Sequence, residues 1–200
     1  MDGKVYILNL NKINIEYTHL LNELPVYCLN KIDKGSNEGL KKVRVLTWYI
    51  LYKILLEEYN IDLTKIDIFE NEHGKPYIND LYFNVTHSKE YIGIIISKEE
   101  CGIDIEKIEL NVDKDRFAKK ILTENEYKEY TEHNSLDYLI KKWTIIETYY
   151  KILGKGIAFS KLNLEIDFAN IFTHKLADDY YLSYGPCECE IIDVLSLNYL

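Results

Sequence analysis

The chain has 200 residues, of which 47% are apolar and 28% charged, a composition that supports a folded core rather than disorder. At this length it buries roughly 70% of the surface of its unfolded form, enough for one sizeable domain or two small lobes. Its net charge of −9 argues against a nucleic-acid binder that relies on an extended basic surface. The sequence has two arginines, Arg44 and Arg116, so few side chains can form a bidentate pair of hydrogen bonds with a phosphate. A small anionic ligand would need a local basic pocket.

The start of the sequence lacks the pattern of a secretion signal, and no apolar stretch approaches the roughly 20 residues that span a bilayer. We therefore expect a soluble, cytoplasmic protein without membrane contact. Its cysteines, Cys28, Cys101, Cys187 and Cys189, are expected to stay reduced. Cys187 and Cys189 have no second Cys/His pair at zinc-like spacing, and the alternating pattern around them predicts strand residues.

Hydrophobic periodicity in the first half of the chain predicts strands around one long amphipathic helix. The predicted elements are, in order, a strand over 4–10, a helix over 37–59, a short strand over 66–69, a turn over 70–76, and strands over 81–85, 91–97 and 101–105.

The second half begins with helices near 113–120 and from Thr123 onward, followed by a longer helix over 135–153. Gly154 then suits the left-handed residue that often ends a helix. The tail from Leu162 to Val194 alternates as strands do, with a polar break at Asp178 and Asp179. Each half thus combines helices with a small sheet. The sequence predicts an α+β fold of two similarly built lobes, 1–100 and 101–200.

Two carboxylates, Asp104 and Glu106, lie two residues apart. Asp104 belongs to the strand predicted over 101–105, and Glu106 follows it directly. Because strand side chains alternate, both point to the same face, while isoleucines fill the other face. Like charges at this separation repel unless a cation lies between them, and Mg²⁺ prefers such oxygen ligands. On spacing alone, a solvated acidic strand face is the more common arrangement.

Glu147 and Lys151 lie one helical turn apart, with Trp143 one turn earlier on the same face. The pair fits a surface ion pair worth roughly 0.3 to 0.5 kcal/mol. It equally fits a carboxylate for a metal ion beside an ammonium for a phosphate, and spacing alone does not separate the two.

Three further motifs carry weaker signals. Thr86, His87 and Ser88 end a strand, where the imidazole can bind an anion, transfer a proton or satisfy the backbone. Lys75 follows Gly74 in a rigid turn, where most lysines are ordinary loop residues. Glu126 lies three residues after Thr123 and fits a capping box, which is a structural role.

In this order and at these separations, the motifs resemble the Sfp-type 4′-phosphopantetheinyl transferases. The matching segments are Gly74 to Pro76, Phe83 to Ser88, Gly102 to Ile108, Glu126 and Trp143 to Gly156. The resemblance implies two pseudo-twofold-related α+β lobes with coenzyme A in the cleft between them. It implies transfer of 4′-phosphopantetheine from coenzyme A to a serine of an apo acyl or peptidyl carrier protein, with release of 3′,5′-ADP. Since both lobes lie in one chain, a monomer suffices.

By position, the resemblance implies that Asp104, Glu106 and Glu147 hold Mg²⁺. It also implies that Lys151 lies beside the pyrophosphate and that Glu126 falls where some members hold a proposed base. Phosphoryl transfer chiefly requires positioning and charge neutralisation, which a metal ion and a lysine supply.

The resemblance also implies which residues contact coenzyme A. Thr86 and His87 match the strand-end phosphate contacts, together with Lys151. Arg44 and Lys75 match contacts around the adenosine 3′-phosphate and the adenine. With Glu147, Lys151 and Glu126, His87 completes the predicted catalytic set.

Two positions depart from the family pattern. Ile146 stands where members usually have a lysine, so one phosphate contact is lost or is replaced by Lys142 or Lys155. Lys89 replaces a glycine after the strand-end motif and adds a charge at the cleft mouth. Ile146 keeps open a catalytically weakened relative that binds coenzyme A or a carrier protein as a scaffold, whereas the intact Asp104, Glu106, Glu147 and Lys151 count against it. An unrelated Mg²⁺-dependent nucleotide enzyme lacks support, because no Gly-rich phosphate loop is present.

Overall fold

The structure is a computed structural model that describes residues 3–32, 37–157, 162 and 167–200. Part of the predicted tail, residues 163–166, lies outside the described residues. The elements are β1 (Gly3–Asn9), η1 (Leu10–Lys12), η2 (Thr18–Glu23), α1 (Val26–Ile32), α2 (Glu38–Tyr59), β2 (Phe69–Glu70), β3 (Pro76–Ile78), β4 (Leu81–Ser88), β5 (Tyr91–Ser97), β6 (Gly102–Lys107), α3 (Lys114–Ile121), α4 (Glu124–His133), α5 (Leu136–Ile152), β7 (Phe172–Ala177), β8 (Tyr180–Gly185), β9 (Glu190–Asp193) and η4 (Val194–Leu197).

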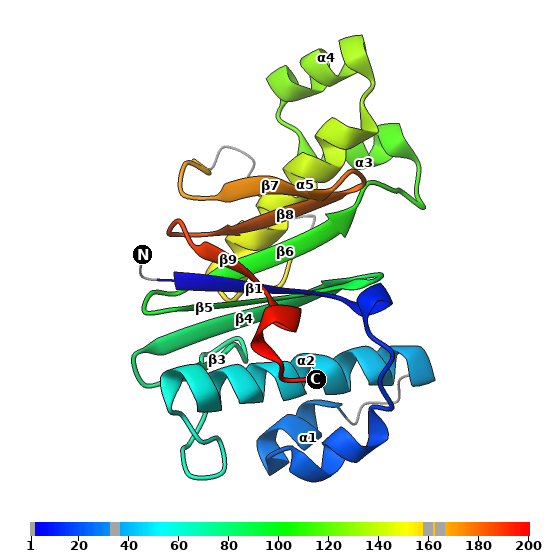
Figure 1. Ribbon diagram of the computed structural model, residues 1–200. Coiled ribbons are helices and arrows are strands. Elements are labelled where there is room, and N and C mark those ends of the chain that lie inside the picture. The colour runs from blue at the N-terminus through cyan, green and yellow to red at the C-terminus, as the bar shows by residue number, and fades with distance from the viewer. Residues whose placement is uncertain (1–2, 33–36, 158–161, 163–166) are drawn as a thin grey trace.

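The strands form two sheets with helices packed against them, which confirms the predicted α+β class (Figure 1). The first sheet has the order β2-β3-β4-β5-β1-β9, and the second has the order β6-β8-β7. Helices α1 and α2 lie on one side of the first sheet, and the second sheet with α5 lies on the other side (Figure 1). No helix within the described residues is long and apolar enough to cross a membrane.

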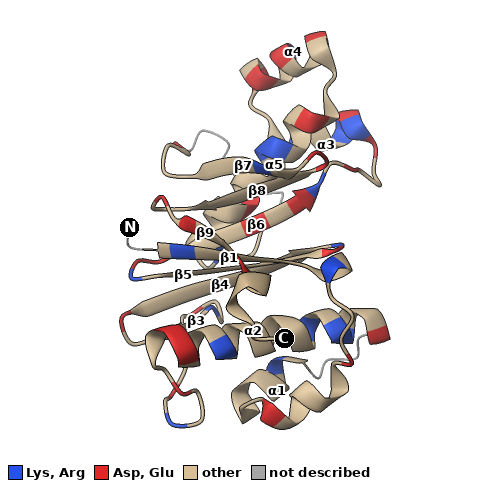
Figure 2. Cartoon of the chain, in the orientation of Figure 1, with Lys and Arg blue, Asp and Glu red and all other residues tan. Residues whose placement is uncertain are grey.

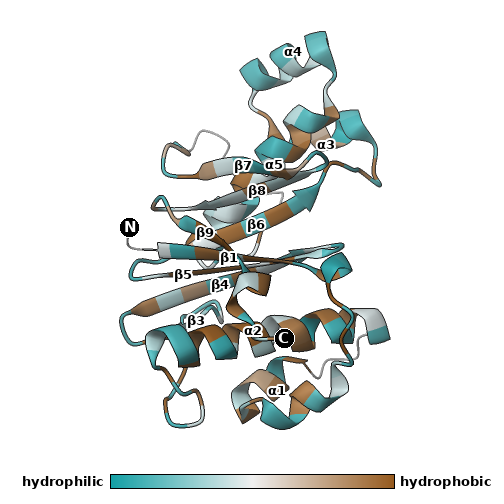
Figure 3. Ribbon diagram, viewed as in Figure 1, coloured by the Kyte–Doolittle hydropathy of each residue, from teal (hydrophilic) through white to brown (hydrophobic). Residues whose placement is uncertain are grey.

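Alternation along β1 explains how the first sheet separates two cores. Tyr6 and Leu8 are fully buried against α2, whereas Val5 and Ile7 face the second sheet. Hydrophobic residues, coloured brown, lie on the central strands of the first sheet and along α2 (Figure 3). The central strand β5 is buried along almost its whole length, because it is covered on both faces, and its sequence is correspondingly a nearly continuous apolar run.

The long helices begin and end at residues that the sequence marks. Asn37 caps α2 by accepting a hydrogen bond from the Leu40 amide at 2.9 Å. Thr123 and Glu126 form the predicted capping box at the start of α4. Gly154 follows α5 with φ +67°, the left-handed conformation expected of a helix end.

Two predictions about local structure were wrong, and one element was missed. The strand expected over 66–69 begins only at Phe69, as β2. Cys187 and Cys189 lie in the connection between β8 and β9, after Pro186, whose missing N–H cannot join a strand ladder. Helix α1 was not predicted, since seven residues give too short a periodic signal.

The last strand, β9, belongs to the first sheet, although the strand before it, β8, belongs to the second. Strand β9 pairs in parallel with β1, from Lys4 with Glu190 to Ile7 with Asp193, and so belongs to the first sheet. It covers the edge of β1, which would otherwise expose unpaired backbone groups. The chain end is also tied to α2, because the Tyr199 hydroxyl donates to Glu58.

Candidate active site

The candidate site lies where β4, β6 and α5 meet. Gly102 at the start of β6 allows the helix to come this close, since a Cβ atom there would lie 2.6 Å from the Thr148 carbonyl and 2.7 Å from the Ile152 amide. On the other side, the Asn84 side chain of β4 accepts a hydrogen bond from the Ile103 amide at 3.2 Å. These contacts fix β6 between the strand and the helix. Asn84 was not singled out by the sequence, because nothing local marks its partner.

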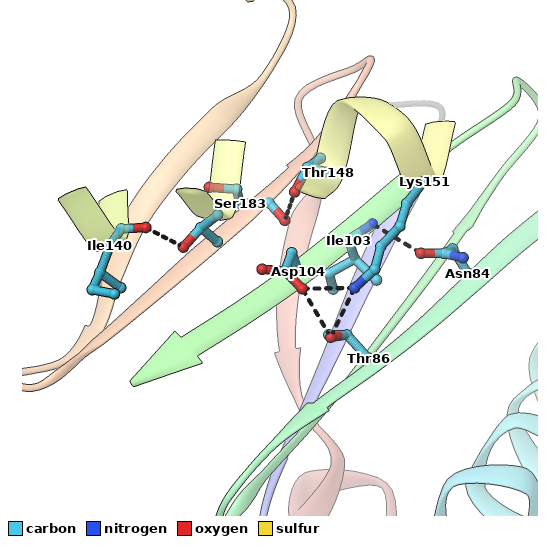
Figure 4. A network of polar contacts seen from close by, with 9 residues as sticks. Asn84, Thr86, Ile103, Asp104, Ile140, Thr148, Lys151 and Ser183 are labelled. Carbon is cyan, nitrogen blue, oxygen red and sulfur yellow. Dashed lines mark hydrogen bonds and ion pairs between the residues drawn. The ribbon is translucent and has the colours of Figure 1, made fainter. Parts of the chain in front are cut away.

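Asp104, Thr86 and Lys151 form a hydrogen-bonded triangle at this junction (Figure 4). The Lys151 ammonium lies 2.6 Å from Asp104 Oδ1 and 3.2 Å from Thr86 Oγ1. Thr86 also donates to Asp104 Oδ1 at 3.3 Å. The Asp104 carboxylate is almost completely buried, so the lysine supplies the countercharge that a buried anion requires.

The predicted carboxylates influence one another electrostatically. Burial, followed by the charges of Asp104 and Glu147, raises the pKa of Glu106 to about 7, against opposing effects of Lys151 and Trp143. Burial and then Asp104 also raise the pKa of Glu147. Burial raises the pKa of Asp104 despite the bonds from Lys151. The three acids therefore share one region that carries more negative charge than Lys151 neutralises.

The donor set suits Mg²⁺, although the side chains do not form a ready metal cage. Among the described residues, no group of three or more His, Cys, Asp or Glu side chains is arranged to hold an ion. One oxygen is nevertheless available as a metal ligand: Asp104 Oδ2 is buried and has no hydrogen-bond partner. Glu106 and Glu147 supply further carboxylate oxygens, the ligands that Mg²⁺ prefers. Orphaned buried oxygens and repelling acids are the features that a divalent cation stabilises.

Positive groups gather on the α2 side of β4. Partial burial lowers the pKa of His87, and the nearby charges of Lys151 and Arg44 lower it further. Arg44 lies in the basic first half of α2, where Lys41 and Lys42 also lie (Figure 2). Its Nη1 atom is buried and has no hydrogen-bond partner. These groups concentrate positive charge locally, which the acidic chain needs in order to bind an anionic ligand.

Lys75 lies at the end of α5 rather than free in a turn. Its ammonium donates to the carbonyls of Cys101 at 2.7 Å, Lys151 at 2.6 Å and Ile152 at 2.9 Å. Burial lowers its pKa. The sequence identified the residue but gave no sign of these partners, which lie far along the chain.

Glu126 is held by its helix cap and by Lys142. Glu126 Oε2 accepts from the Thr123 amide at 2.9 Å, and Oε1 lies 2.6 Å from the Lys142 ammonium. Burial acts to raise its pKa, but the bonds from Lys142 and Thr123 outweigh burial and lower it. Glu126 is therefore ionised at neutral pH, and a base role remains a prediction.

The two departures from the family pattern occupy distinct environments. Ile146 is buried in the core that α5 forms with α3, with Phe117 and Leu122. Lys89, the residue at the β4–β5 turn, has φ 50° and pairs with Glu109 at 2.6 Å. Both residues of this ion pair line a cavity of about 260 Å³ that also contacts Glu106. The charge added by Lys89 is thus balanced beside the acidic group.

Comparison with known proteins connects this site to one family. Residues 100–185, which include β6 and α5, match the family model of the 4′-phosphopantetheinyl transferase superfamily. The chain is 34% identical over 112 residues to 4′-phosphopantetheinyl transferase gsp of Aneurinibacillus migulanus, a match covering 54% of this chain and 46% of that protein. It is 28% identical over 154 residues to 4′-phosphopantetheinyl transferase Sfp of Bacillus subtilis (strain 168), covering 72% and 66%. The match thus spans about half the length of the first relative and just under two thirds of the second.

Proposed function

Because the chain belongs to the 4′-phosphopantetheinyl transferase superfamily and is Sfp-like, we propose that it transfers 4′-phosphopantetheine from coenzyme A to a serine of an apo carrier protein. The observation that carries this proposal is the junction of Lys151 with Asp104 and Thr86, beside the acids Glu106 and Glu147. An ammonium and a cluster of carboxylates near the positive groups His87 and Arg44 match the needs of phosphoryl transfer.

In this reaction the serine oxygen forms a bond to the β-phosphorus of coenzyme A, and the bond from that phosphorus to the bridging oxygen breaks. The electron pair of the broken bond leaves with 3′,5′-ADP, while the serine proton passes to a base. Asp104, Glu106 and Glu147 would hold Mg²⁺, which when bound neutralises charge on the pyrophosphate. Lys151 stabilises the negative charge that develops on the departing phosphate.

The remaining residues of the site bind and orient the donor. His87 and Thr86 end β4 next to Lys151, so they are suited to contact phosphate oxygens. The unpaired Nη1 of Arg44 is available to the adenosine 3′-phosphate. Glu126, which is ionised at neutral pH and can therefore accept a proton, is the proposed base for the serine.

We also propose that residues 1–100 and 101–200 form two lobes related by a pseudo-twofold axis, with the donor between them. In support, each half packs one long helix, α2 or α5, against antiparallel strands. The exchange of β9 into the first sheet then ties the lobes together. One chain carries every proposed site residue, so a monomer suffices.

The direct test is the intact mass of an apo carrier protein after incubation with this protein, coenzyme A and Mg²⁺. We expect the mass to rise by one phosphopantetheine group on at least one carrier in a panel from fatty-acid, polyketide and peptide synthesis. Failure on every carrier, with a working control transferase in parallel, would overturn the proposal. Binding of coenzyme A without transfer would instead support a scaffold that has lost catalysis.

A further inference from the structure

The Lys75 ammonium joins three segments that are distant in sequence. It extends from the turn before β3 to the residue before β6, Cys101, and to the final residues of α5, Lys151 and Ile152. All three contacts are to backbone carbonyls, between 2.6 and 2.9 Å. A lysine ammonium has three donors, so the three carbonyls use its full capacity.

This placement meets a specific need of the helix. The last carbonyls of an α-helix have no partner within the helix, and they carry the negative end of its dipole. Lys75 supplies hydrogen bonds and a positive charge to two of them, and it is partly shielded from water. One of these carbonyls belongs to Lys151 itself, so Lys75 acts on the backbone of the residue whose side chain pairs with Asp104.

The turn that carries Lys75 is built to fit this helix end. The Asn71 side chain accepts from the amides of His73 and Lys75, each at 2.9 Å, and this rigidifies the turn. A Cβ atom on Gly154 would lie 2.4 Å from Asn71 Nδ2 and 3.3 Å from Lys75 Cβ. The two glycine-containing motifs, around Gly74 and Gly154, therefore pack directly against each other.

We propose that Lys75 is a positioning residue for the transfer reaction: it fixes the last turn of α5, and thereby the Lys151 ammonium on Asp104 and Thr86, instead of contacting coenzyme A. The inference rests on the proposed function and departs from the family-based expectation that Lys75 contacts the adenosine portion. A lysine that donates to three protein carbonyls has no donor left for a phosphate.

The decisive experiment compares coenzyme A with 3′-dephospho-coenzyme A as donor, using Lys75→Met and Arg44→Met. We expect Lys75→Met to lower kcat by about 10- to 100-fold, as misplaced catalytic groups do, with KM for the donor changing by less than about 3-fold. The loss should be equal with both donors. Arg44→Met should lose much more activity with coenzyme A than with 3′-dephospho-coenzyme A. A Lys75→Met defect that appears in KM, or disappears with the dephospho donor, would overturn the proposal, as would unchanged activity.

A second measurement separates this inference from the proposed function. Amide hydrogen exchange of residues 149–153 should quicken in Lys75→Met but not in Lys4→Met, which removes a comparable lysine that pairs with Glu58 at 2.7 Å. If the wild-type protein transfers nothing, the proposed function fails while the exchange result still supports or overturns the anchoring of α5. If Lys75→Met does not fold, Lys75→Arg is measured in the same way, with the same outcomes expected on a smaller scale.

Discussion

The Lys151 ammonium lies 2.6 Å from Asp104 Oδ1, although the two residues are 47 positions apart in the chain. Strand β6 buries the carboxylate, and the last turn of α5 delivers the ammonium. The pair therefore connects the second sheet to its covering helix at the point where the first sheet contributes Thr86. Its loss has consequences for both stability and catalysis.

Replacing Lys151 by Met should destabilise the fold, because Asp104 is left buried without a countercharge. The lysine side chain is 26% exposed and the aspartate 4%, so we expect a cost near the lower end of the range for buried pairs, about 3 kcal/mol. Urea denaturation measures this cost. Lys65→Met is the control, since the Lys65 side chain is 78% exposed, and the loss of its pair with Asp62 should cost less than about 1 kcal/mol. Equal losses in the two variants would contradict the buried ion pair.

Mg²⁺ should stabilise the protein through the acidic cluster. A cation present at ten times its dissociation constant adds about 1.4 kcal/mol to the free energy of unfolding. Glu106→Gln and Glu147→Gln should reduce this gain, because each removes a repelling carboxylate and a ligand. Asp137→Asn is the control, as Asp137 pairs with Lys175 and Tyr181. Thermal unfolding with and without Mg²⁺ measures this stabilisation. An equal stabilisation by Mg²⁺ in all variants would exclude Glu106 and Glu147 as ligands.

Replacing Arg44 by Met should weaken coenzyme A binding by about 10- to 100-fold, the value of one or two charge-assisted hydrogen bonds. The matched control is Arg116→Met, which changes the exposed arginine of α3 by the same atoms and charge. Isothermal titration calorimetry measures both dissociation constants. Equal affinities in the two variants would show that the 3′-phosphate lies elsewhere.

Gly154→Ala should destabilise the protein by about 1 to 2 kcal/mol, because alanine is strained at φ +67° and its Cβ meets the Asn71 side chain. Gly156→Ala is a control from the same motif. A Cβ atom there has no neighbour within 4 Å, so the change should stay within about 0.5 kcal/mol of zero. Chemical denaturation compares the two, and equal effects would argue against the tight contact of the motifs.

The sequence predicted those features whose signals are local. The capping box of Thr123, the exit at Gly154 and the alternation of Asp104 and Glu106 with isoleucines depend on neighbouring residues, and each is present in the structure. The resemblance to a family then assigned roles that periodicity alone left open.

Features that depend on long-range partners were not predictable. Lys75 looked like an ordinary loop lysine because its carbonyl partners lie 26 to 77 positions away. Lys142, one of two lysines that the sequence offered as a replacement for the phosphate contact missing at Ile146, pairs with Glu126. The return of β9 to the first sheet likewise depends on which strand edge is free, and no local pattern encodes that.

The stoichiometry of a single reaction decides whether the protein transfers phosphopantetheine. Apo carrier protein, coenzyme A, Mg²⁺ and this protein are incubated, and both 3′,5′-ADP and holo carrier are quantified over time. We predict one 3′,5′-ADP for each phosphopantetheine attached, with both products lost in Lys151→Met under conditions where that variant is folded. Unmodified carrier, or an undiminished yield of both products from the variant, would contradict the claim.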